Sequence, residues 1–478
     1  MLLVIDIGTS TFKAALRAFD GTHKGEAERA LTMVSRGGGF ETESAQWLRA
    51  FEETAAELGA GGGLGAVEAV VISGNGPTVV PVIGDPGLAG LGLQAEAARL
   101  WLDRRAVEEA RTVSAIMGGY VDASFFLPKI LMMKNREHEA YERTRYFMGP
   151  PEFLTYALTG EARTVFPSEG FDRWYWNDEV LAAAGLDREK FPAFVSPGDY
   201  IGDLLPAARF GFNPGVKVFA GGPDFFVSIL GSGTVRPGQI CDRSGTSEGL
   251  NLCTRSRIID RRLMSYGHPV TGFWNLSGII STSGKAIGWG RELLGIADVS
   301  YDAFYALAAE AAPGAGGVIF LPYLAGERAP IWDPKARGVF MGLSLDTGRE
   351  ELARSIAEGV CFAIRDVITV MEELGAPVEE LRLTGGPSEC DFLNQLKADV
   401  TGRRVVVPGG AAELTGLALI GAAAMGKYGS AAEAAAAMAG TGRVFTPDRE
   451  KTRIYDGIFP EYRALYRSLK ERWYQVTN

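Results

Sequence analysis

Two short apolar runs at the start of the chain flank a small polar turn. Residues 2–7 and 12–16 are largely apolar and are separated by Gly8-Thr9-Ser10-Thr11, a pattern typical of two antiparallel strands joined by a tight turn. The turn suits a phosphate group, because Gly8 lets an anion approach the backbone and its neighbours offer N–H and hydroxyl donors. Lys13 adds a positive charge, whereas Asp6 would repel a phosphate unless it holds Mg²⁺, which commonly bridges carboxylates and nucleotide phosphates. The alternative is a buried hairpin in which Asp6 only caps a turn.

The same pattern returns in the middle of the chain. Gly245-Thr246-Ser247 lies between residues 239–244 and 248–252, two runs that could also form strands. One such turn is weak evidence, since small polar turns are common. Two of them, each near the start of one half of the chain, indicate a duplicated domain with two phosphate-binding hairpins that face one cleft.

Strand-like and helix-like patterns alternate through both halves of the chain, which predicts an α/β layered fold. Strands are predicted at residues 67–72, 78–83, 216–220, 273–281 and 381–384. Helices are predicted at residues 45–58, with Ser44 as the N-cap, and at 94–116, 349–374, 411–425 and 431–438. Residues 84–92 are predicted to form a loop.

A further candidate for chemistry lies where a strand ends in two glycines and an apolar helix begins. Asp224 stands at that corner, directly after Gly221-Gly222-Pro223. Aspartate is a favoured helix N-cap, and that role needs no chemistry. In a chain with two phosphate-binding turns, however, a positioned carboxylate can accept the proton of an alcohol during phosphoryl transfer. We therefore predict that Asp224 is a general base.

Length, charge and composition limit the number of domains and the classes of partner that the chain can have. With 478 residues, 46% of them apolar, the chain is long enough for two or three globular domains with large cores. The net charge of −10 argues against a nucleic-acid partner. The N-terminus has no leader pattern and no apolar run could span a bilayer, which predicts a cytoplasmic protein without a membrane partner. Only three histidines and no CxxC spacing argue against a zinc site.

Several motifs, in order along nearly the whole chain, resemble the FGGY family of carbohydrate kinases within the actin-like ATPase superfamily. The resemblance is greatest to the xylulokinase branch of that family. The motifs are Asp6-Ile7-Gly8-Thr9-Ser10, Trp101-Leu102-Asp103-Arg104, Pro128-Lys129-Ile130-Leu131, Gly221-Gly222-Pro223-Asp224, Ser244-Gly245-Thr246-Ser247, residues 321–330 and 338–343, and Leu383-Thr384-Gly385-Gly386-Pro387.

The resemblance implies two actin-like (ribonuclease H-like) domains, residues 1–235 and 236–478, which close on ATP and Mg²⁺ in the cleft between them. The γ-phosphate would pass to a hydroxyl of a small sugar or polyol, with Asp224 as the catalytic base and Asp6 as the metal-associated acid. The implied ATP phosphate-binding residues are Gly8, Thr9, Ser10, Lys13, Gly245 and Thr246. The implied nucleotide-binding residues are Gly284, Gly386 and Pro387, and the implied sugar-binding residues are Trp101, Asp103 and Asp224. A homodimer is also implied.

The chain departs from the family pattern where the sugar would bind. Gly76-Pro77 stands where xylulokinases usually carry Met-His, and Pro223 and Phe225 flank the proposed base where Gly or His and Asn are more usual. The aromatic segment around Trp174 has no counterpart that we can place, and could form a carbohydrate surface or a packed loop.

The acceptor implied by the resemblance is a ketopentose such as xylulose, and another ketose, a polyol or a glycerol-like compound is the alternative. A nucleotide-binding protein with a regulatory or chaperone-like role, without sugar kinase activity, is the alternative of another class. It would keep both hairpins without needing Asp224. An oxidoreductase is poorly supported, because the first turn lacks a GxGxxG motif leading into a helix.

Overall fold

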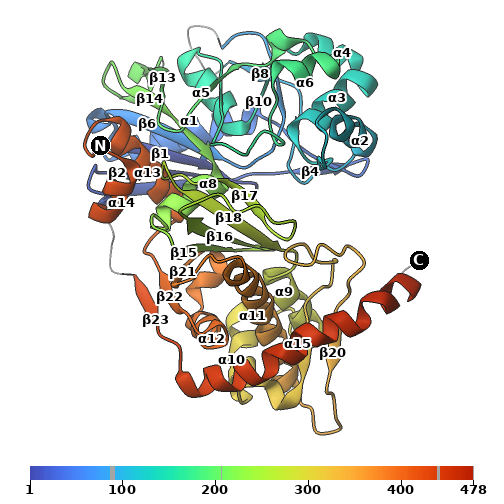
Figure 1. The fold of residues 1–478 in the computed structure, drawn as a ribbon. Helices are drawn as coiled ribbons and strands as arrows, with labels where there is room; N and C mark the ends of the chain where they lie inside the picture. The colour runs from blue at the N-terminus through green and yellow to red at the C-terminus, as the bar shows by residue number, and fades with distance from the viewer. Residues whose placement is uncertain (87–91, 206, 439–441, 477–478) are drawn as a thin grey trace. The chain divides into compact units, whose positions relative to one another are not determined.

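The computed structural model describes residues 1–86, 92–205, 207–438 and 442–476, so residues 87–91 of the predicted loop lie outside the described part. The chain divides into two compact units. Unit 1 consists of Met1–Gly231 and Glu413–Met438, and unit 2 consists of Ser232–Ala412 and Ala439–Asn478. In each unit a mixed sheet packs with helices, as Figure 1 shows by element label. Among the described helices, none is long and apolar enough to cross a bilayer.

A six-stranded sheet forms the centre of unit 1. Its strands are, in order across the sheet, β13 (Tyr200–Asp203), β14 (Lys217–Pro223), β6 (Ala69–Gly74), β1 (Leu2–Ile7), β2 (Thr11–Arg17) and β3 (His23–Ala30). β1 and β2 form the predicted antiparallel hairpin, whereas β1, β6 and β14 run parallel. The carboxyl ends of these three strands therefore meet at one edge of the sheet, where the chain continues into Gly8, Asn75 and Asp224.

Smaller sheets and helices surround this centre. The smaller sheets pair β4 (Val34–Arg36), β5 (Gly39–Thr42) and β9 (Ala98–Arg99), then β10 (Tyr146–Met148), β7 (Val80–Ile83) and β8 (Gln94–Ala95), then β11 (Arg163–Val165) and β12 (Ala193–Val195). The helices are α1 (Ala45–Ala60), α2 (Val107–Ile116), α3 (Phe126–Arg136), α4 (His138–Arg143), α5 (Pro150–Thr159), α6 (Asp178–Ala183), α7 (Ala207–Phe210), α8 (Asp224–Gly231), α13 (Ala412–Ala424) and α14 (Ala431–Met438), with short 3-10 turns at Leu64–Ala66 and Arg188–Lys190.

Both faces of the unit 1 sheet are covered, because its central strands are apolar on both faces. Alternate residues of β1, including Leu3 and Ile5, lie in one core with side chains of α1 and α5. The opposite face carries Leu2 and Val71 and is covered by α13. A Cβ added to Gly421 of α13 would lie only 2.8 Å from Val71 Cγ2, so this helix and the sheet are in close contact.

The helices α13 and α14 belong to unit 1, although both follow residue 236, where the second family domain is predicted to begin. The two helices lie where the alanine-rich pattern predicts them, but that local pattern carries no information on which sheet they cover. α13 is apolar on all sides, as expected for a helix buried between other elements. A Cβ at Gly416 would lie 2.1 Å from the Val227 carbonyl oxygen of α8, so only glycine permits this backbone contact. The boundary at 235/236 stays a prediction about the two family domains.

A seven-stranded sheet forms the centre of unit 2. In order across the sheet its strands are β17 (Met264–Gly267), β18 (Trp274–Ile280), β16 (Glu248–Thr254), β15 (Gln239–Ser244), β21 (Glu380–Thr384), β22 (Arg404–Val407) and β23 (Arg443–Phe445). β15 pairs with β16 as an antiparallel hairpin on one side and with the parallel strand β21 on the other. β1 has the same two kinds of neighbour in unit 1, so the two hairpins occupy equivalent places in two similar sheets.

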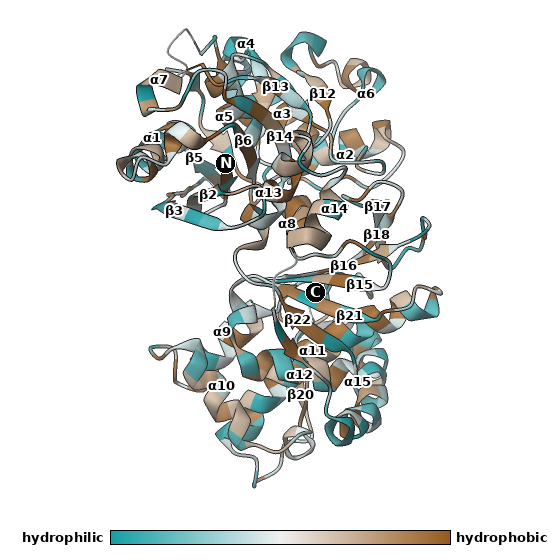
Figure 2. Ribbon diagram, turned by 90° about the vertical axis from the view of Figure 1, so that its left-hand side faces the viewer, coloured by the Kyte–Doolittle hydropathy of each residue, from teal (hydrophilic) through white to brown (hydrophobic). Residues whose placement is uncertain are grey.

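The rest of unit 2 packs around a long buried helix. Its remaining elements are β19 (Ile319–Leu321), β20 (Val339–Met341), α9 (Gly284–Leu293), α10 (Tyr301–Glu310), α11 (Arg349–Glu373), α12 (Asp391–Thr401) and α15 (Arg449–Val476), with 3-10 turns at Ala315–Gly317 and Gly386–Glu389. α11 is the predicted amphipathic helix and contributes much of the unit 2 core. Figure 2 shows hydrophobic colour along the strands of this sheet and hydrophilic colour on α15.

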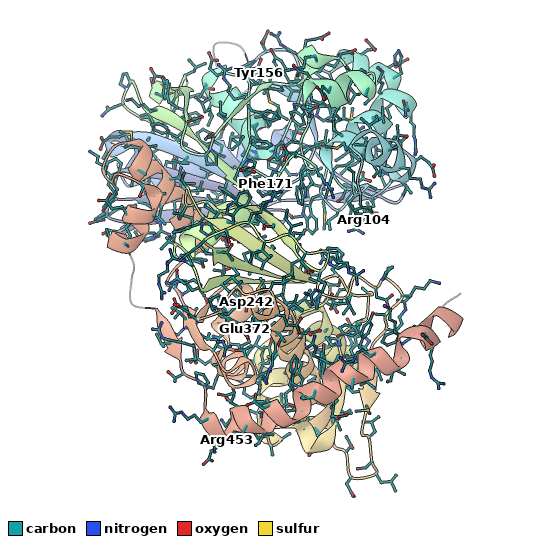
Figure 3. The ribbon with its side chains drawn as sticks, in the orientation of Figure 1. Arg104, Tyr156, Phe171, Asp242, Glu372 and Arg453 are labelled. Carbon is teal, nitrogen blue, oxygen red and sulfur yellow. The ribbon has the colours of Figure 1, made fainter. Side chains whose placement is uncertain are left out.

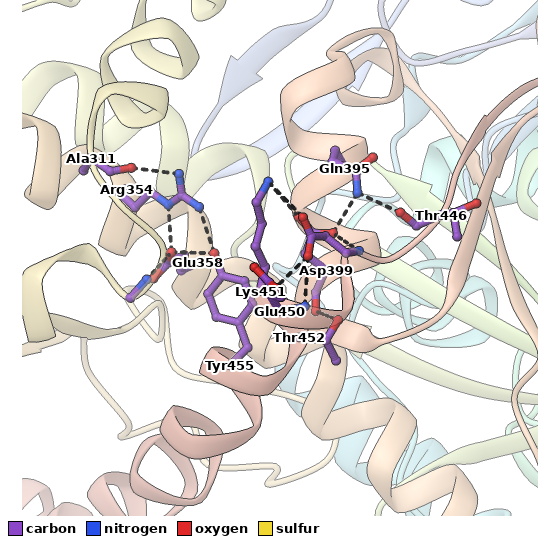
Figure 4. Close-up of polar contacts among 12 residues, drawn as sticks. Ala311, Arg354, Glu358, Gln395, Asp399, Thr446, Glu450, Lys451, Thr452 and Tyr455 are labelled. Carbon is purple, nitrogen blue, oxygen red and sulfur yellow. Dashed lines mark hydrogen bonds and ion pairs between the residues drawn. The ribbon is translucent and has the colours of Figure 1, made fainter.

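The C-terminal helix α15 is an element that the sequence analysis did not predict. Its first turns are attached to α11 and α12 by buried polar groups (Figure 4). The Tyr455 hydroxyl donates to Glu358 Oε1 and accepts from Arg354 Nη2, both at 2.8 Å. Asp399 of α12 accepts the backbone N–H of Asp448 at 2.8 Å. These contacts add to the apolar face of α15, whose Phe459 and Tyr462 lie in the unit 2 core.

The helix predicted over residues 94–116 is wrong in its first half. Residues 94–99 include the short strands β8 and β9, and α2 begins only at Val107. Arg99 and Val79 exchange two backbone hydrogen bonds, at 2.8 and 2.9 Å, so strand pairing with a distant segment replaces the local helical pattern. Trp101 and Asp103 consequently lie in a turn before α2. Ser44 does precede α1, but its side chain makes no capping hydrogen bond.

Candidate active site

The turn between β1 and β2 is held from behind by Asn75. Asn75 donates its backbone N–H to the Ile7 carbonyl at 2.8 Å and its side-chain amide to the carbonyls of Ile7 and Gly8, each at 3.0 Å. Because C=O and N–H point in opposite directions in a trans peptide, the Thr9 N–H points away from Asn75. Thr9 is half-buried and Ser10 is exposed, so the turn offers amide and hydroxyl donors at the sheet edge, as an anion site requires.

Trp101 contacts the same turn through its indole. The indole Nε1 donates to Thr9 Oγ1 at 2.9 Å, although the side chain remains 40% exposed. The Trp101 backbone N–H donates to Thr78 Oγ1 at 3.2 Å, and that hydroxyl donates to Asn75 Oδ1 at 2.6 Å. Thr9, Trp101, Thr78 and Asn75 therefore form one connected network around the turn. The residue predicted to bind sugar also touches the predicted phosphate site.

Asp6 lies on β1, two residues before the turn, and is 8% exposed. Its Oδ1 accepts the Ser73 hydroxyl at 2.7 Å. Lys13 is opposite Asp6 in the hairpin register, so both side chains emerge on one face of the sheet. No group of three His, Cys, Asp or Glu side chains that could hold a metal occurs among the described residues. A Mg²⁺ ion at Asp6 would therefore take most ligands from water and phosphate, which is its usual preference.

Asp224 begins α8, directly after β14. In the register of the parallel strands, Pro223 pairs with Gly74 and Gly74 with Ile7. This places Asp224 and the turn at Gly8 on the same sheet edge, separated by two strand spacings or roughly 10 Å. The half-buried Asp224 carboxylate accepts the N–H of Phe225 at 2.6 Å. The predicted base is thus at a helix N-terminus, where a carboxylate is favoured.

Asp103 differs from the other predicted site residues because it is completely buried. Both of its carboxylate oxygens accept the Arg105 Nε, at 3.1 and 3.0 Å, and Arg105 also reaches Glu41 at 2.6 Å. Hydrogen bonding to Asp103 raises the pKa of Arg105 despite partial burial. Asp103 therefore fixes the turn before α2 through Arg105, and its predicted contact with the sugar stays a prediction.

The aromatic segment around Trp174 packs beside Asp224. The rings of Phe171 and Phe225 are 5.8 Å apart, and those of Phe171 and Trp174 are 5.3 Å apart. Trp174 in turn lies 5.3 Å from Phe125. Phe171 is buried, whereas Phe225, Trp174 and Phe125 are half-buried, so the segment is a packed loop that keeps some aromatic surface. Figure 3 labels Phe171 within this part of unit 1.

The second turn, between β15 and β16, is held from behind by the start of α9. The Gly284 N–H donates to the Gly245 carbonyl at 2.9 Å, and the N–H groups of Ser283 and Lys285 donate to the Thr246 carbonyl at 3.2 Å. By the same trans-peptide argument, the N–H groups of Thr246 and Ser247 point away from α9. Two adjacent amides with that direction form a concave anion site.

Glycines bring two further segments against this turn. A Cβ on Gly284 would lie 2.4 Å from the Gly245 oxygen, and one on Gly385 would lie 2.0 Å from the Ser244 oxygen. Gly385 also has a φ of +88°, a conformation that side chains disfavour. At Gly386 a Cβ would meet nothing within 4 Å. Gly245, Thr246, Gly284, Gly386 and Pro387 thus gather at one edge of the unit 2 sheet.

A buried ionic cluster lies beneath the second turn. Lys397 Nζ donates to Asp242 Oδ2 and Ser244 Oγ, each at 2.8 Å, and to Glu248. Burial and the neighbouring Glu248 charge raise the pKa of Asp242 well above its usual value. Burial also opposes ionisation of Glu248, but the Lys397 charge and hydrogen bonds lower the pKa of Glu248 to about 2. The two carboxylates likewise overcome the burial of Lys397 and raise its pKa. Figure 3 labels Asp242 on β15.

Comparison with known proteins gives the family. The N-terminal domain of the FGGY family of carbohydrate kinases matches residues 1–231, and the C-terminal domain of that family matches residues 243–425. The chain is 32% identical over 423 residues to a xylulose kinase from Klebsiella pneumoniae, covering 84% of this chain and 85% of the relative. It is 30% identical over 430 residues to a xylulose kinase from Escherichia coli (strain K12), covering 85% and 86%. This protein belongs to the FGGY family of carbohydrate kinases.

A solved structure supports the fold as well as the family. The structure of a xyloylose kinase from Brucella ovis superposes with a TM-score of 0.86 at 26% identity, covering 98% of this chain and 99% of the other. The prediction of an actin-like α/β fold is therefore confirmed. As a member of this family, the protein is an ATP-dependent sugar kinase.

Within this FGGY kinase the predicted residues fall into two sets. In unit 1, Asp6, Gly8, Thr9, Ser10, Lys13, Trp101 and Asp224 lie at or beside one sheet edge. In unit 2, the five predicted residues gather around the second turn. Asp103 is the exception, since its carboxylate faces Arg105 instead of an open surface.

Several supporting residues escaped the sequence analysis. Asn75 and Thr78 are hydrogen-bonded around the first turn, and Lys397 and Glu248 lie beneath the second. A fifth, Lys129, is fully buried and donates to the carbonyls of Pro77 and Leu100, the latter at 3.1 Å. Burial lowers the pKa of Lys129 to about 7. A lysine inside an otherwise apolar run was the available signal for Lys129, whereas Lys397 lies among polar residues of a helix and gave no such signal.

Proposed function

We propose that this kinase transfers the γ-phosphate of Mg-ATP to a hydroxyl of a small sugar or polyol, with a ketopentose such as xylulose as the first acceptor to test. The observation that carries the proposal is the unit 1 sheet edge, where Asp224, the Gly8-Thr9-Ser10 turn and Asp6 all lie at the ends of parallel strands. The xylulose kinase relatives support the choice of acceptor. Glycerol-like compounds, other ketoses and polyols remain the alternatives.

The roles follow from the chemistry of each group. Asp224, whose carboxylate is fixed at the start of α8, accepts the proton of the attacking hydroxyl as general base. The outward amides and hydroxyls of Thr9 and Ser10, with Lys13, hold phosphate oxygens, and Gly245 and Thr246 supply the equivalent donors of unit 2. Gly284, Gly386 and Pro387 accommodate the nucleoside. Trp101 supports the first turn and offers its exposed face to the acceptor.

Asp6 is the residue that would hold Mg²⁺, directly or through water. The surroundings of Asp6 fit this ion, because Mg²⁺ is commonly held by one or two carboxylates together with phosphates. When bound, Mg²⁺ neutralises phosphate charge as it develops. The Ser73 hydroxyl, 2.7 Å from Asp6 Oδ1, fixes the carboxylate.

The decisive experiment measures ADP release from Mg-ATP with a panel of ketopentoses, ketohexoses, polyols and glycerol. We expect one acceptor to give a strong signal and Asp224→Ala to lower kcat by roughly 10²- to 10⁴-fold, the range for loss of a general base. Asp203→Ala, which removes an exposed carboxylate from β13, is the matched control and should leave kcat unchanged.

The outcomes separate the alternatives. Near-normal turnover of Asp224→Ala would exclude Asp224 as the base. ATP hydrolysis that no acceptor stimulates would contradict phosphorylation of a panel compound and favour another use of the nucleotide. A homodimer and a cytoplasmic location stay predictions from the sequence.

A further inference from the structure

The buried cluster in unit 2 joins both strands of the second hairpin to two segments that are distant from it in sequence. Asp242 and Ser244 come from β15, Glu248 opens β16, Ser283 precedes α9, and Lys397 comes from α12. None of the five side chains is more than 4% exposed. The cluster is almost completely enclosed by the protein. An effect of the cluster on substrate must therefore act through the groups to which its side chains are hydrogen-bonded.

The hydrogen bonds of the cluster end on both sides of the second turn. Lys397 Nζ contacts Ser244 Oγ at 2.8 Å, and Ser244 Oγ donates to Glu248 Oε1 at 2.8 Å. These two residues directly flank Gly245-Thr246-Ser247. The second oxygen of Glu248 accepts the Ser283 hydroxyl. Ser283 occupies the N-cap position of α9 but makes no side-chain cap, because its hydroxyl is used in this contact.

Stability alone is a weak reason for such a cluster. Burying an ion costs several kcal/mol, and well-packed apolar side chains can often replace buried ion pairs without loss of stability. The surrounding positions are apolar: Ile240 and Leu250 of the hairpin and Leu396 of α12 are all buried. A charged cluster here supplies something that an apolar core would not, namely hydrogen bonds of fixed direction to the ends of the turn.

We propose that Lys397 is a positioning residue for the phosphates of ATP. By holding Ser244 and Glu248 it fixes both ends of the second turn, and through Glu248 and Ser283 it fixes the start of α9. The N–H groups of α9 in turn hold the carbonyls of Gly245 and Thr246. The cluster thereby sets the direction of the outward Thr246 and Ser247 amides. This inference rests on the proposed function, in which that turn binds phosphate.

The first test compares two variants that separate positioning from folding. Lys397→Met leaves two buried carboxylates unpaired and is expected to lower stability strongly. The triple variant Asp242→Asn/Glu248→Gln/Lys397→Met has no charge in the cluster, so we expect its unfolding midpoint to recover towards that of the wild type. It still lacks the ammonium group that joins the ends of the turn.

The readout is direct binding of a non-hydrolysable ATP analogue and, separately, of adenosine to the full chain. For the triple variant we expect at least a tenfold weaker Kd for the ATP analogue and a clearly smaller change for adenosine, which contacts Gly284 in the proposed site but has no phosphates. In steady-state assays the KM for ATP should rise while the KM for the acceptor stays within twofold. Ser283→Ala, which keeps the charges, should give the same pattern at a few-fold level.

Arg354→Met is the matched control. Arg354 is also a buried cation of unit 2, paired with the buried Glu358 at 2.8 Å and drawn in Figure 4, but it lies at the α15 contact. The Arg354→Met variant should have lower stability but the same Kd for the ATP analogue. Equal weakening by Arg354→Met, or wild-type affinity in a folded triple variant, would overturn the positioning role. A wild-type chain that binds no ATP analogue would instead contradict the proposed function.

Discussion

The two hairpins occupy equivalent places in two similar sheets, yet they are supported by different chemistry. Behind the first turn, Asn75 and Thr78 form a neutral network in which each contact is a single hydrogen bond. Behind the second, Lys397 and two carboxylates form a charged cluster. In both turns the carbonyl groups are tied to the protein, so the amides on the other side are directed outwards.

The two turns share the outward direction of their backbone amides. They differ in the side chains that support that direction. A neutral amide can hold two carbonyls from one side chain. A buried lysine carries a charge, so the second site also needs carboxylates to neutralise it, and it becomes sensitive to their protonation. The two turns should therefore respond differently to mutation and to pH.

The largest effect on stability is expected when a side chain is added at Gly385, next to the second turn. Gly385→Ala would place a Cβ 2.0 Å from the Ser244 oxygen at a φ of +88°. We expect a loss of at least about 3 kcal/mol in unfolding free energy, since both the contact and the backbone conformation are unfavourable. Urea denaturation would measure this loss of unfolding free energy, and hydrogen exchange would show whether it is localised in β15 and β16.

Its neighbour provides the control for this substitution. Gly386→Ala meets no atom within 4 Å and should change stability by less than about 0.5 kcal/mol. If Gly386 also lies against the nucleotide, this variant raises the KM for ATP without unfolding. Equal stability losses for the two alanine variants would refute the close-packing argument.

The next largest loss of stability is expected when the uncharged Asn75 side chain behind the first turn is removed. Asn75→Ala removes the side-chain amide that the Ile7 and Gly8 carbonyls accept. We expect a loss of about 1–3 kcal/mol, because these buried acceptors lose a partner, together with a higher KM for ATP. Asn75→Asp is the shape-matched comparison and should be at least as harmful, since a carboxylate cannot donate to carbonyls.

A pH measurement sharpens the contrast between the turns. The pKa of Glu248, at about 2, is below its ordinary value of 4.5, so its ionisation stabilises the fold above pH 4.5 and this contribution is lost as the pH falls towards 2. The stability difference between wild type and Glu248→Gln should therefore shrink on acidification through this window. Asn75→Ala should show no such trend, and a difference that grew at low pH would be inconsistent with the charged cluster.

The smallest effect is expected at Trp101. Trp101→Phe keeps the aromatic ring but loses the hydrogen bond to Thr9 Oγ1 at 2.9 Å. We expect a change of about 1 kcal/mol or less, seen as a KM for ATP raised by no more than about fivefold. Trp101→Ala would in addition remove the exposed ring, so a selective rise in the acceptor KM for that variant would identify a sugar contact.

The local pattern of apolar and polar residues was sufficient to predict the strands and helices that carry the site residues. The apolar runs around each Gly-Thr-Ser turn predicted β1, β2, β15 and β16, and the glycine corner before an apolar helix predicted the start of α8 at Asp224. The long amphipathic helix α11 was equally clear. In these segments, neighbours in sequence form the structure, so short-range periodicity and turn chemistry contain the necessary information.

Tertiary structure decided what depends on partners distant in sequence. Pairing of β8 with β7 and of β9 with β5 replaced the first part of a predicted helix. The Asp103 carboxylate is buried in an ion pair with Arg105. α13 covers the unit 1 sheet although it follows most of unit 2 in the chain. The sequence showed Asn75 and Lys397 only as a polar residue in a turn and a lysine in a helix. Their roles arise because folding brings the ends of parallel strands together, which no local pattern encodes.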